Sequence, residues 1–157
     1  AVVDTLDFIP RERSDLRAPL EQMARELAVT LKAHVDPASM VWYQIPNKPG
    51  TPGNYLESSA SSMFVYFYAK ALNQGLIDNS YRDFTLKAYQ GLLNQFVLVD
   101  ANGTAHLTQM VQVAGLGFGR DGSYEYYMSE PVFRNDAKAN GPFIMAGVQM
   151  AKLLTTH

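Results

Sequence analysis

The stretch GNYLESSASSMFVYFYAKALNQG, residues 53–75, decides the fold. It opens with small polar residues and continues at helical length with apolar or aromatic side chains on nearly every face. A helix at a protein surface normally shows one apolar stripe. The lack of a clean polar face therefore predicts a helix buried all round. The apolar set is Leu56, Ala60, Met63, Phe64, Val65, Phe67, Ala71 and Leu72.

The ends of this helix carry recognisable signals. Asn54 is a favourable N-cap residue, and Glu57 follows it at the spacing of a capping box. Gly75 is typical of the residue that follows a helix, so the helix is expected to end at Asn73 or Gln74. A second all-apolar helix is expected in FIMAGVQMAKLL, residues 143–154, with Pro142 at its first position.

Two other segments predict amphipathic helices. Residues 16–35 and the segment that begins near Ser80 and Asp83 each place apolar residues at steps of three and four. The leading AVVDTLDFIP reads as the last turns of another helix, stopped by Pro10. The apolar stripes are Leu16, Leu20, Met23, Leu27, Leu31 and Val35 in the first segment, and Phe84, Ala88, Leu92 and Phe96 in the second.

Amphipathic and all-apolar helices thus alternate along the chain. Two concentric layers explain this, because inner helices touch both their ring neighbours and the outer layer. The sequence predicts an all-α fold, about half of an α/α toroid, in which residues 1–157 belong to a single domain. The stretch VLVDANGTAHL, residues 97–107, adds a small β-hairpin around an Asn-Gly turn.

Composition excludes several classes of function. Apolar residues make up 47% of the 157, and the formal net charge is −2, with no basic stripe for nucleic acid. No apolar run reaches the roughly 20 residues of a membrane span. The chain has no cysteine, and no carboxylate–histidine spacing suggests a metal, so no cofactor is predicted.

Three separated motifs resemble glycoside hydrolase family 105, the unsaturated rhamnogalacturonyl and glucuronyl hydrolases, in its C-terminal half. The three motifs are GNYLESSASSMFVYFYAKALNQG (residues 53–75), DANGTAHLTQMVQVAGLG and RDGSYEYYMSEPVFRNDAKANGPF. AVVDTLDFIP is similar to the stretch that follows the family's Trp- and Arg-containing substrate motif. The resemblance covers essentially the whole chain. It departs at Ala139-Asn140, where the family tends toward Gly-Val.

The resemblance implies a bacterial (α/α)6 barrel that acts on oligosaccharides left by polysaccharide lyases. An aspartic acid protonates the C4=C5 double bond of the terminal sugar, water adds at C5, and the hemiketal collapses. The catalytic aspartates and the uronate-binding motif of the family match no position in this chain, so no catalytic residue is assigned. The compartment stays open between cytoplasm and periplasm.

The long loops before the two inner helices mark the expected binding face, where helix N-termini favour a carboxylate. The candidate substrate-binding residues are Tyr43, Asn54, Glu57, Arg120, Tyr124, Ser129, Glu130 and Lys138. Asn54 and Glu57 have capping as an alternative role. Tyr43 follows Trp42, for which core packing is favoured.

The other candidates also have local alternatives. Arg120 suits a uronate carboxylate, or else tethers Asp121 or Glu125. Tyr124, Tyr126 and Tyr127 alternate like a short strand with one face in the core. Ser129 and Glu130 suit sugar hydroxyls, and Lys138 suits an ion pair with Asp136. His106, on a short strand, is expected to be structural.

Two classes of function are therefore considered. The first is part of an unsaturated uronyl hydrolase, whose partners are the oligosaccharide and either the N-terminal half of the ring or a second copy of the chain. The second is a non-catalytic helical carbohydrate-binding or scaffold module. The exposed apolar sides of a half ring predict that the chain is not a lone monomer.

Overall fold

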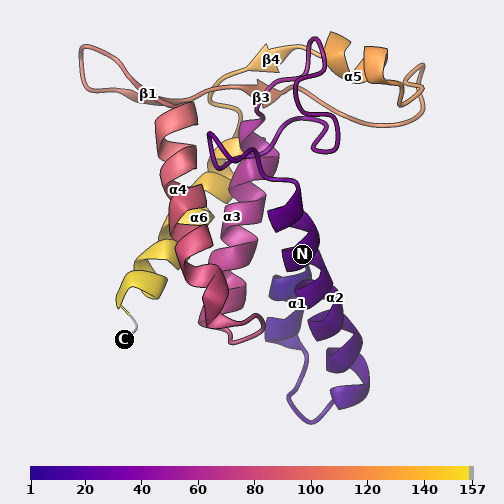
Figure 1. Ribbon diagram of the computed structural model, residues 1–157, viewed down its shortest axis with the longest axis vertical. Helices are drawn as coiled ribbons and strands as arrows, with labels where there is room; N and C mark the ends of the chain where they lie inside the picture. Colours follow the sequence, from indigo (N-terminus) through magenta and orange to yellow (C-terminus); the bar gives the residue numbers. More distant parts are fainter. Residues whose placement is uncertain (156–157) are drawn as a thin grey trace.

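The computed structural model describes residues 1–155 and is mostly helical (Figure 1). Short strands connect some of the helices at one end of the molecule. The elements are α1 (Val2–Phe8), α2 (Ser14–Ala33), α3 (Ser58–Asn73), the 3-10 helix η1 (Asn79–Tyr81), α4 (Arg82–Phe96), β1 (Val97–Val99), β2 (Ala105–Leu107), β3 (Met110–Val111), α5 (Tyr124–Ser129), β4 (Val132–Phe133) and α6 (Ala137–Thr155).

The long helices alternate in direction, which confirms the two predicted layers. Figure 1 shows α1, α3 and α6 running away from the end that carries the strands, while α2 and α4 return toward it. The inner helix α3 packs along α6 and also contacts α1, α2 and α4. This is the arrangement expected for part of an α/α toroid. In residues 1–155, no helix is both long and apolar enough to cross a membrane.

Trp42 joins the two layers and is fully buried, which confirms its predicted core role. Its Nε1–H donates to the Leu31 carbonyl at 2.8 Å. Its indole meets the rings of Phe64 and Phe84 edge-on, at centroid distances of 5.2 and 6.2 Å. Phe67 is buried as expected for an inner helix, whereas Phe64 is only half-buried. The loop before α3 thus helps to hold α2, α3 and α4 together.

The apolar stripe predicted for α4 is confirmed, but that of α2 is partly wrong. Leu16 and Met23 are exposed, and the buried face of α2 runs through Ala24 and Ala28 instead. The Tyr68 hydroxyl of α3 donates to the carbonyl of Ala28. The small alanine side chains let α3 approach this closely, so the contact face is rotated away from the larger residues.

The predicted start of α3 is also wrong. Asn54 is not the N-cap, because the helix begins at Ser58 and Glu57 is itself the N-cap residue. The Glu57 carboxylate accepts a hydrogen bond from the Ala60 N–H at 2.7 Å. No capping box forms between Asn54 and Glu57. At the other end Gly75 follows the helix with φ of +67°, as predicted.

The start of α6 differs from the prediction for a similar reason. The helix begins at Ala137, so Pro142 lies inside it and not at its first position. The Asp136 carboxylate accepts a hydrogen bond from the Lys138 N–H at 2.8 Å. This cap starts the helix five residues before the proline. Proline has no N–H to donate, so at Pro142 the helical hydrogen bond to the carbonyl four residues earlier is absent.

Two further local predictions are wrong. Asp78, and not Ser80, caps the turn before α4, because its carboxylate accepts the Ser80 N–H at 2.8 Å. The tyrosines of α5 form a short helix where alternation had indicated a strand. The Ser123 hydroxyl caps α5 by accepting the Tyr126 N–H at 3.1 Å.

The strands form two small antiparallel pairs. In the predicted hairpin, β1 pairs with β2, with Val97 opposite Leu107. The second pair, β3 with β4, was not predicted, and it places Met110 opposite Phe133. Figure 1 shows these strands and α5 lying across the same end of the helices. This end, which we call the mouth, carries the predicted binding face.

Candidate functional site

Strand β3 ties the N-terminal ends of the two inner helices together at the mouth. The Val111 N–H donates to Glu57 Oε1 at the start of α3, at 3.1 Å. The Val111 carbonyl accepts a hydrogen bond from Lys138 Nζ in the first turn of α6. The Ser58 N–H also bonds to the Gln109 carbonyl. Both inner helices therefore begin at the same end, as the toroid prediction requires.

Glu57 is a buried carboxylate with an internal role. Its side chain is 1% exposed. Besides the Val111 and Ala60 N–H groups, it accepts the Ser59 hydroxyl at 2.7 Å. Three donors neutralise much of the cost of burying a charge. Glu57 thus anchors β3 to α3. Its predicted alternative role in capping is confirmed, but Glu57 acts as the N-cap itself and not as the partner of Asn54.

Arg120 and Glu130 form the charged pair of the mouth. Arg120 Nε donates to Glu130 Oε1 at 3.3 Å. Arg120 pairs with Glu130 in place of the predicted tethers to Asp121 or Glu125, and the Asp121 carboxylate accepts the Ser123 N–H. Burial, and then a hydrogen bond to Glu130, raise the pKa of Tyr126. Arg120, Tyr126 and Glu130 are therefore one connected group.

Tyr55 is a mouth residue that the sequence did not single out. Its hydroxyl is buried and has no hydrogen-bond partner among residues 1–155. Burial, followed by the nearby charges of Glu57 and Glu130, raises the pKa of Tyr55 to about 12. The phenol is neutral at physiological pH and able to donate. The hydroxyls of Ser58 and Ser62 on α3 are also buried and have no partner in the described part of the chain.

Two predicted binding residues hold the proline-containing loop against α5. The Asn54 carboxamide accepts the Ile45 N–H at 3.2 Å and donates to the Ile45 and Lys48 carbonyls at 3.0 and 2.8 Å. The Tyr124 hydroxyl donates to the Pro52 carbonyl at 2.9 Å. The loop therefore has one defined shape, and Asn54 and Tyr124 both contribute to it.

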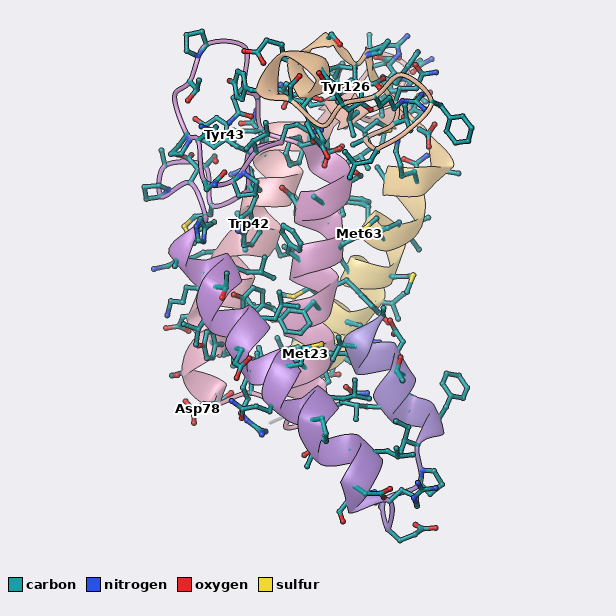
Figure 2. The ribbon with its side chains drawn as sticks, turned by 90° about the vertical axis from the view of Figure 1, so that its right-hand side faces the viewer. Met23, Trp42, Tyr43, Met63, Asp78 and Tyr126 are labelled. Atoms are coloured by element: carbon teal, nitrogen blue, oxygen red, sulfur yellow. The ribbon has the colours of Figure 1, made fainter. Side chains whose placement is uncertain are left out.

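A cavity of about 380 Å³ lies between this loop and α5. Tyr43 lies elsewhere, in a separate hollow of about 220 Å³ shared with His34 and Pro46. Figure 2 places Tyr43 and Tyr126 at the mouth and Asp78 at the opposite end. The residues that line the larger cavity are Gln44, Ile45, Pro46, Lys48, Gly122, Tyr124 and Tyr127. No spacing signal in the sequence connected the loop with α5.

The remaining candidates make local contacts. The exposed Ser129 donates to the Tyr126 carbonyl at 2.7 Å, at the end of α5. Lys138 Nζ lies 3.7 Å from Asp136 Oδ1, which confirms the predicted local pair.

His106 contacts Asp100 and Asn135 through its two ring nitrogens, which agrees with a structural role. The described part of the chain contains no group of three potential metal ligands.

The chain is similar to two bacterial proteins and to solved structures of glycoside hydrolases. A protein of Agrobacterium fabrum and the 24.9 kDa protein in the picA locus of Rhizobium radiobacter are each 37% identical over 155 residues. The match covers 93% of this chain and 65% of each relative. The structure of a family 105 glycoside hydrolase from C. acetobutylicum ATCC 824 is also 37% identical, with a TM-score of 0.93.

These matches define a part of a longer fold. The chain is covered to 96% by the C. acetobutylicum structure but spans 42% of it. A possible family 105 member from Salmonella enterica, 21% identical with a TM-score of 0.77, shares the fold, and this chain covers 36% of it. The predicted resemblance to family 105 is confirmed. The sequence profile of Glycosyl Hydrolase Family 88 matches residues 1–154, and the chain belongs to that family.

Proposed function

We propose that this chain forms part of the ring of an enzyme that removes an unsaturated uronyl group from lyase-generated oligosaccharides. The observation that supports this most directly is the likeness to the C. acetobutylicum family 105 structure over 96% of the chain. In the proposed reaction an acid protonates the C4=C5 double bond, water adds at C5, and the resulting hemiketal opens to release the remaining saccharide.

The mouth supplies groups that suit an acidic sugar. Arg120 uses Nε for Glu130, and its terminal nitrogens have no hydrogen-bond partner within residues 1–155. A guanidinium with free N–H groups binds a carboxylate well. Tyr55 adds a neutral donor that has no partner of its own. In this proposal Arg120 contacts the substrate, and the buried Tyr55 hydroxyl lies behind it next to Glu130.

The proton donor is proposed to lie in another part of the ring. A general acid must reach the substrate and exchange its proton there. Glu57 is enclosed by three protein donors, and Glu130 is paired with Arg120. Neither carboxylate is free for this role, so this chain is assigned binding and support of the mouth.

A complementation experiment tests the proposal. The part of the C. acetobutylicum chain that this protein does not cover is produced separately and mixed with it. Hydrolysis of an unsaturated uronyl disaccharide is followed by the loss of the ultraviolet absorbance of its double bond. We expect turnover by the mixture and none by either part alone, with the saturated disaccharide unchanged. A mixture that assembles by light scattering but shows no turnover contradicts the proposal.

The same experiment distinguishes the non-catalytic alternative. A carbohydrate-binding or scaffold module would assemble and bind saturated and unsaturated saccharides alike, without turnover. Turnover by this chain alone would instead place the acid within it and return attention to Glu57 and Glu130.

A further inference from the structure

The cavity between the 44–48 loop and α5 has the composition of a saccharide site. We propose that it binds one uronate residue of an acidic oligosaccharide, as a subsite separate from the Arg120–Glu130 group. The proposal rests on the proposed function only for the class of ligand. The geometry, the free polar groups and the charge of the cavity carry it.

The walls of the cavity are aromatic and fixed in position. Tyr124 and Tyr127 lie one turn apart on α5 and both line it. The Tyr124 hydroxyl is bonded to Pro52, and the opposite loop is held by the Asn54 carboxamide. The Tyr127 ring also contacts that of Tyr126, at 5.2 Å between centroids. A preformed cavity avoids the ordering cost that weakens binding to flexible loops.

Three polar groups that line this cavity have no partner. Lys48 Nζ, the Gln44 carboxamide and the Tyr127 hydroxyl form no hydrogen bond or ion pair with any described residue. Polar groups that converge on an otherwise apolar pocket commonly fix the orientation of a ligand. Here they offer an ammonium, an amide and a phenol, which match the carboxylate and hydroxyls of a sugar acid.

The size of the cavity and the charge of its lining limit the class of ligand further. The volume of about 380 Å³ lies at the lower end of the range for ligand sites, about 300–1,000 Å³, which suits a single sugar ring. Lys48 is the one cation among the lining residues, and none of them is acidic. Aromatic surfaces cover the apolar face of a sugar, while the ammonium selects a carboxylate over a neutral hydroxymethyl group.

Binding of saturated trigalacturonate by isothermal titration calorimetry tests the subsite. The protein is used in the assembled form of the activity experiment, and the fully methyl-esterified trisaccharide is the uncharged control ligand. We expect Lys48→Gln to weaken trigalacturonate binding about tenfold, as for loss of one charge-assisted hydrogen bond. Binding of the ester is expected to be weaker and unaffected by this substitution.

Matched variants separate the subsite from general effects. Lys87→Gln removes one positive charge from an exposed position of α4 and is expected to leave binding unchanged. Tyr127→Phe keeps the ring and is expected to weaken binding less than Tyr127→Ala. Equal affinities for Lys48→Gln and Lys87→Gln would overturn the subsite. The ligand lacks the double bond, so this result is independent of hydrolysis, whose absence would overturn only the proposed function.

Discussion

A ligand carboxylate was expected at the N-terminus of α3, at the mouth. The carboxylate that lies there is the protein's own, from Glu57. It neutralises the start of α3 and accepts the Val111 N–H from a strand 54 residues away. A charge that satisfies three donors is costly to replace, because each donor then loses its partner in a buried place. The first prediction therefore concerns this side chain.

Glu57→Gln should destabilise the protein by about 1–3 kcal/mol, since the amide NH2 faces donors that need an acceptor. Urea denaturation of the variant and of wild type measures the change. Glu125→Gln, at an exposed position of α5, is the control and should change stability little. Equal midpoints for the Glu57 and Glu125 variants would show that the anchor contributes nothing to stability.

At the scale of elements, one ion-pair network joins α1 to α3. Lys70 Nζ lies 2.6 Å from both Asp4 Oδ1 and Asp7 Oδ2, and the Tyr66 hydroxyl donates to Asp4. Burial alone would raise the pKa of Asp4, but hydrogen bonds from Lys70 and Tyr66 bring it below its ordinary 3.8. A carboxyl with a depressed pKa stabilises the fold above the unfolded-state value and loses that contribution as the pH falls.

The unfolding midpoint of wild type should therefore drop as the pH is lowered below 3.8. Lys70→Met should drop less steeply over that window, because the Asp4 pKa moves back toward its ordinary value. Thermal unfolding at several pH values measures both slopes. Lys87→Met, on the exposed side of α4, should keep the wild-type slope; identical slopes for all three proteins would contradict the role of Lys70.

Two helix glycines, Gly91 in α4 and Gly147 in α6, differ in the space that is available for a Cβ atom. A Cβ at Gly91 would lie 2.3 Å from the Ser39 carbonyl oxygen, which belongs to backbone that cannot easily move. A Cβ at Gly147 in α6 would lie 3.3 Å from the Tyr89 hydroxyl, at the end of a side chain. Gly91→Ala should cost about 1–3 kcal/mol from overpacking.

Gly147→Ala is the matched control for Gly91→Ala. It should be neutral or stabilising by up to about 1 kcal/mol from helix propensity. Chemical denaturation of the two variants tests the contrast. A Gly91→Ala variant as stable as Gly147→Ala would mean that the turn at Ser39 shifts freely.

Local sequence patterns predicted where the helices lie better than they predicted where the helices begin or which distant segments they contact. The Phe84–Phe96 stripe of α4 follows from its own spacing, and the Trp42 core role from its size. At the start of α3, Glu57 caps the Ala60 N–H and also accepts the Val111 N–H, and no nearby residue reveals this second contact. The cavity beside α5 likewise joins the 44–48 loop to a helix of six residues, too short for periodicity to show. Both features depend on contacts between residues far apart in the sequence, which residue spacing alone does not reveal.

At the scale of the whole molecule, one face of α6 exposes apolar side chains that no described contact covers. Ile144 and Val148, one turn apart on α6, are 64% and 51% exposed, and Met145 and Leu154 of the same helix are exposed as well. The chain spans only 42% of the C. acetobutylicum structure that it matches. Exposed apolar patches of this kind commonly mark contact surfaces. We propose that this face contacts another part of the ring, in a complementary segment or in a second copy.

The last prediction tests that contact. The double substitution Ile144→Lys and Val148→Lys should change the free energy of unfolding of the chain by no more than about 0.5 kcal/mol, because neither side chain is buried in it. Assembly with the complementary C. acetobutylicum segment, or with a second copy, should be lost, because an ammonium at each position would have to be desolvated without a partner. Light scattering of the mixed proteins measures assembly.

The control for this variant is Val29→Lys, at a position of α2 that is 62% exposed and lies in the outer layer. It adds the same kind of charge away from α6 and should assemble as wild type does. If the doubly substituted chain also assembles normally, the α6 face is not the contact. The ring must then close through other exposed residues, of which Phe8 on α1 is the next to test, since it is 86% exposed.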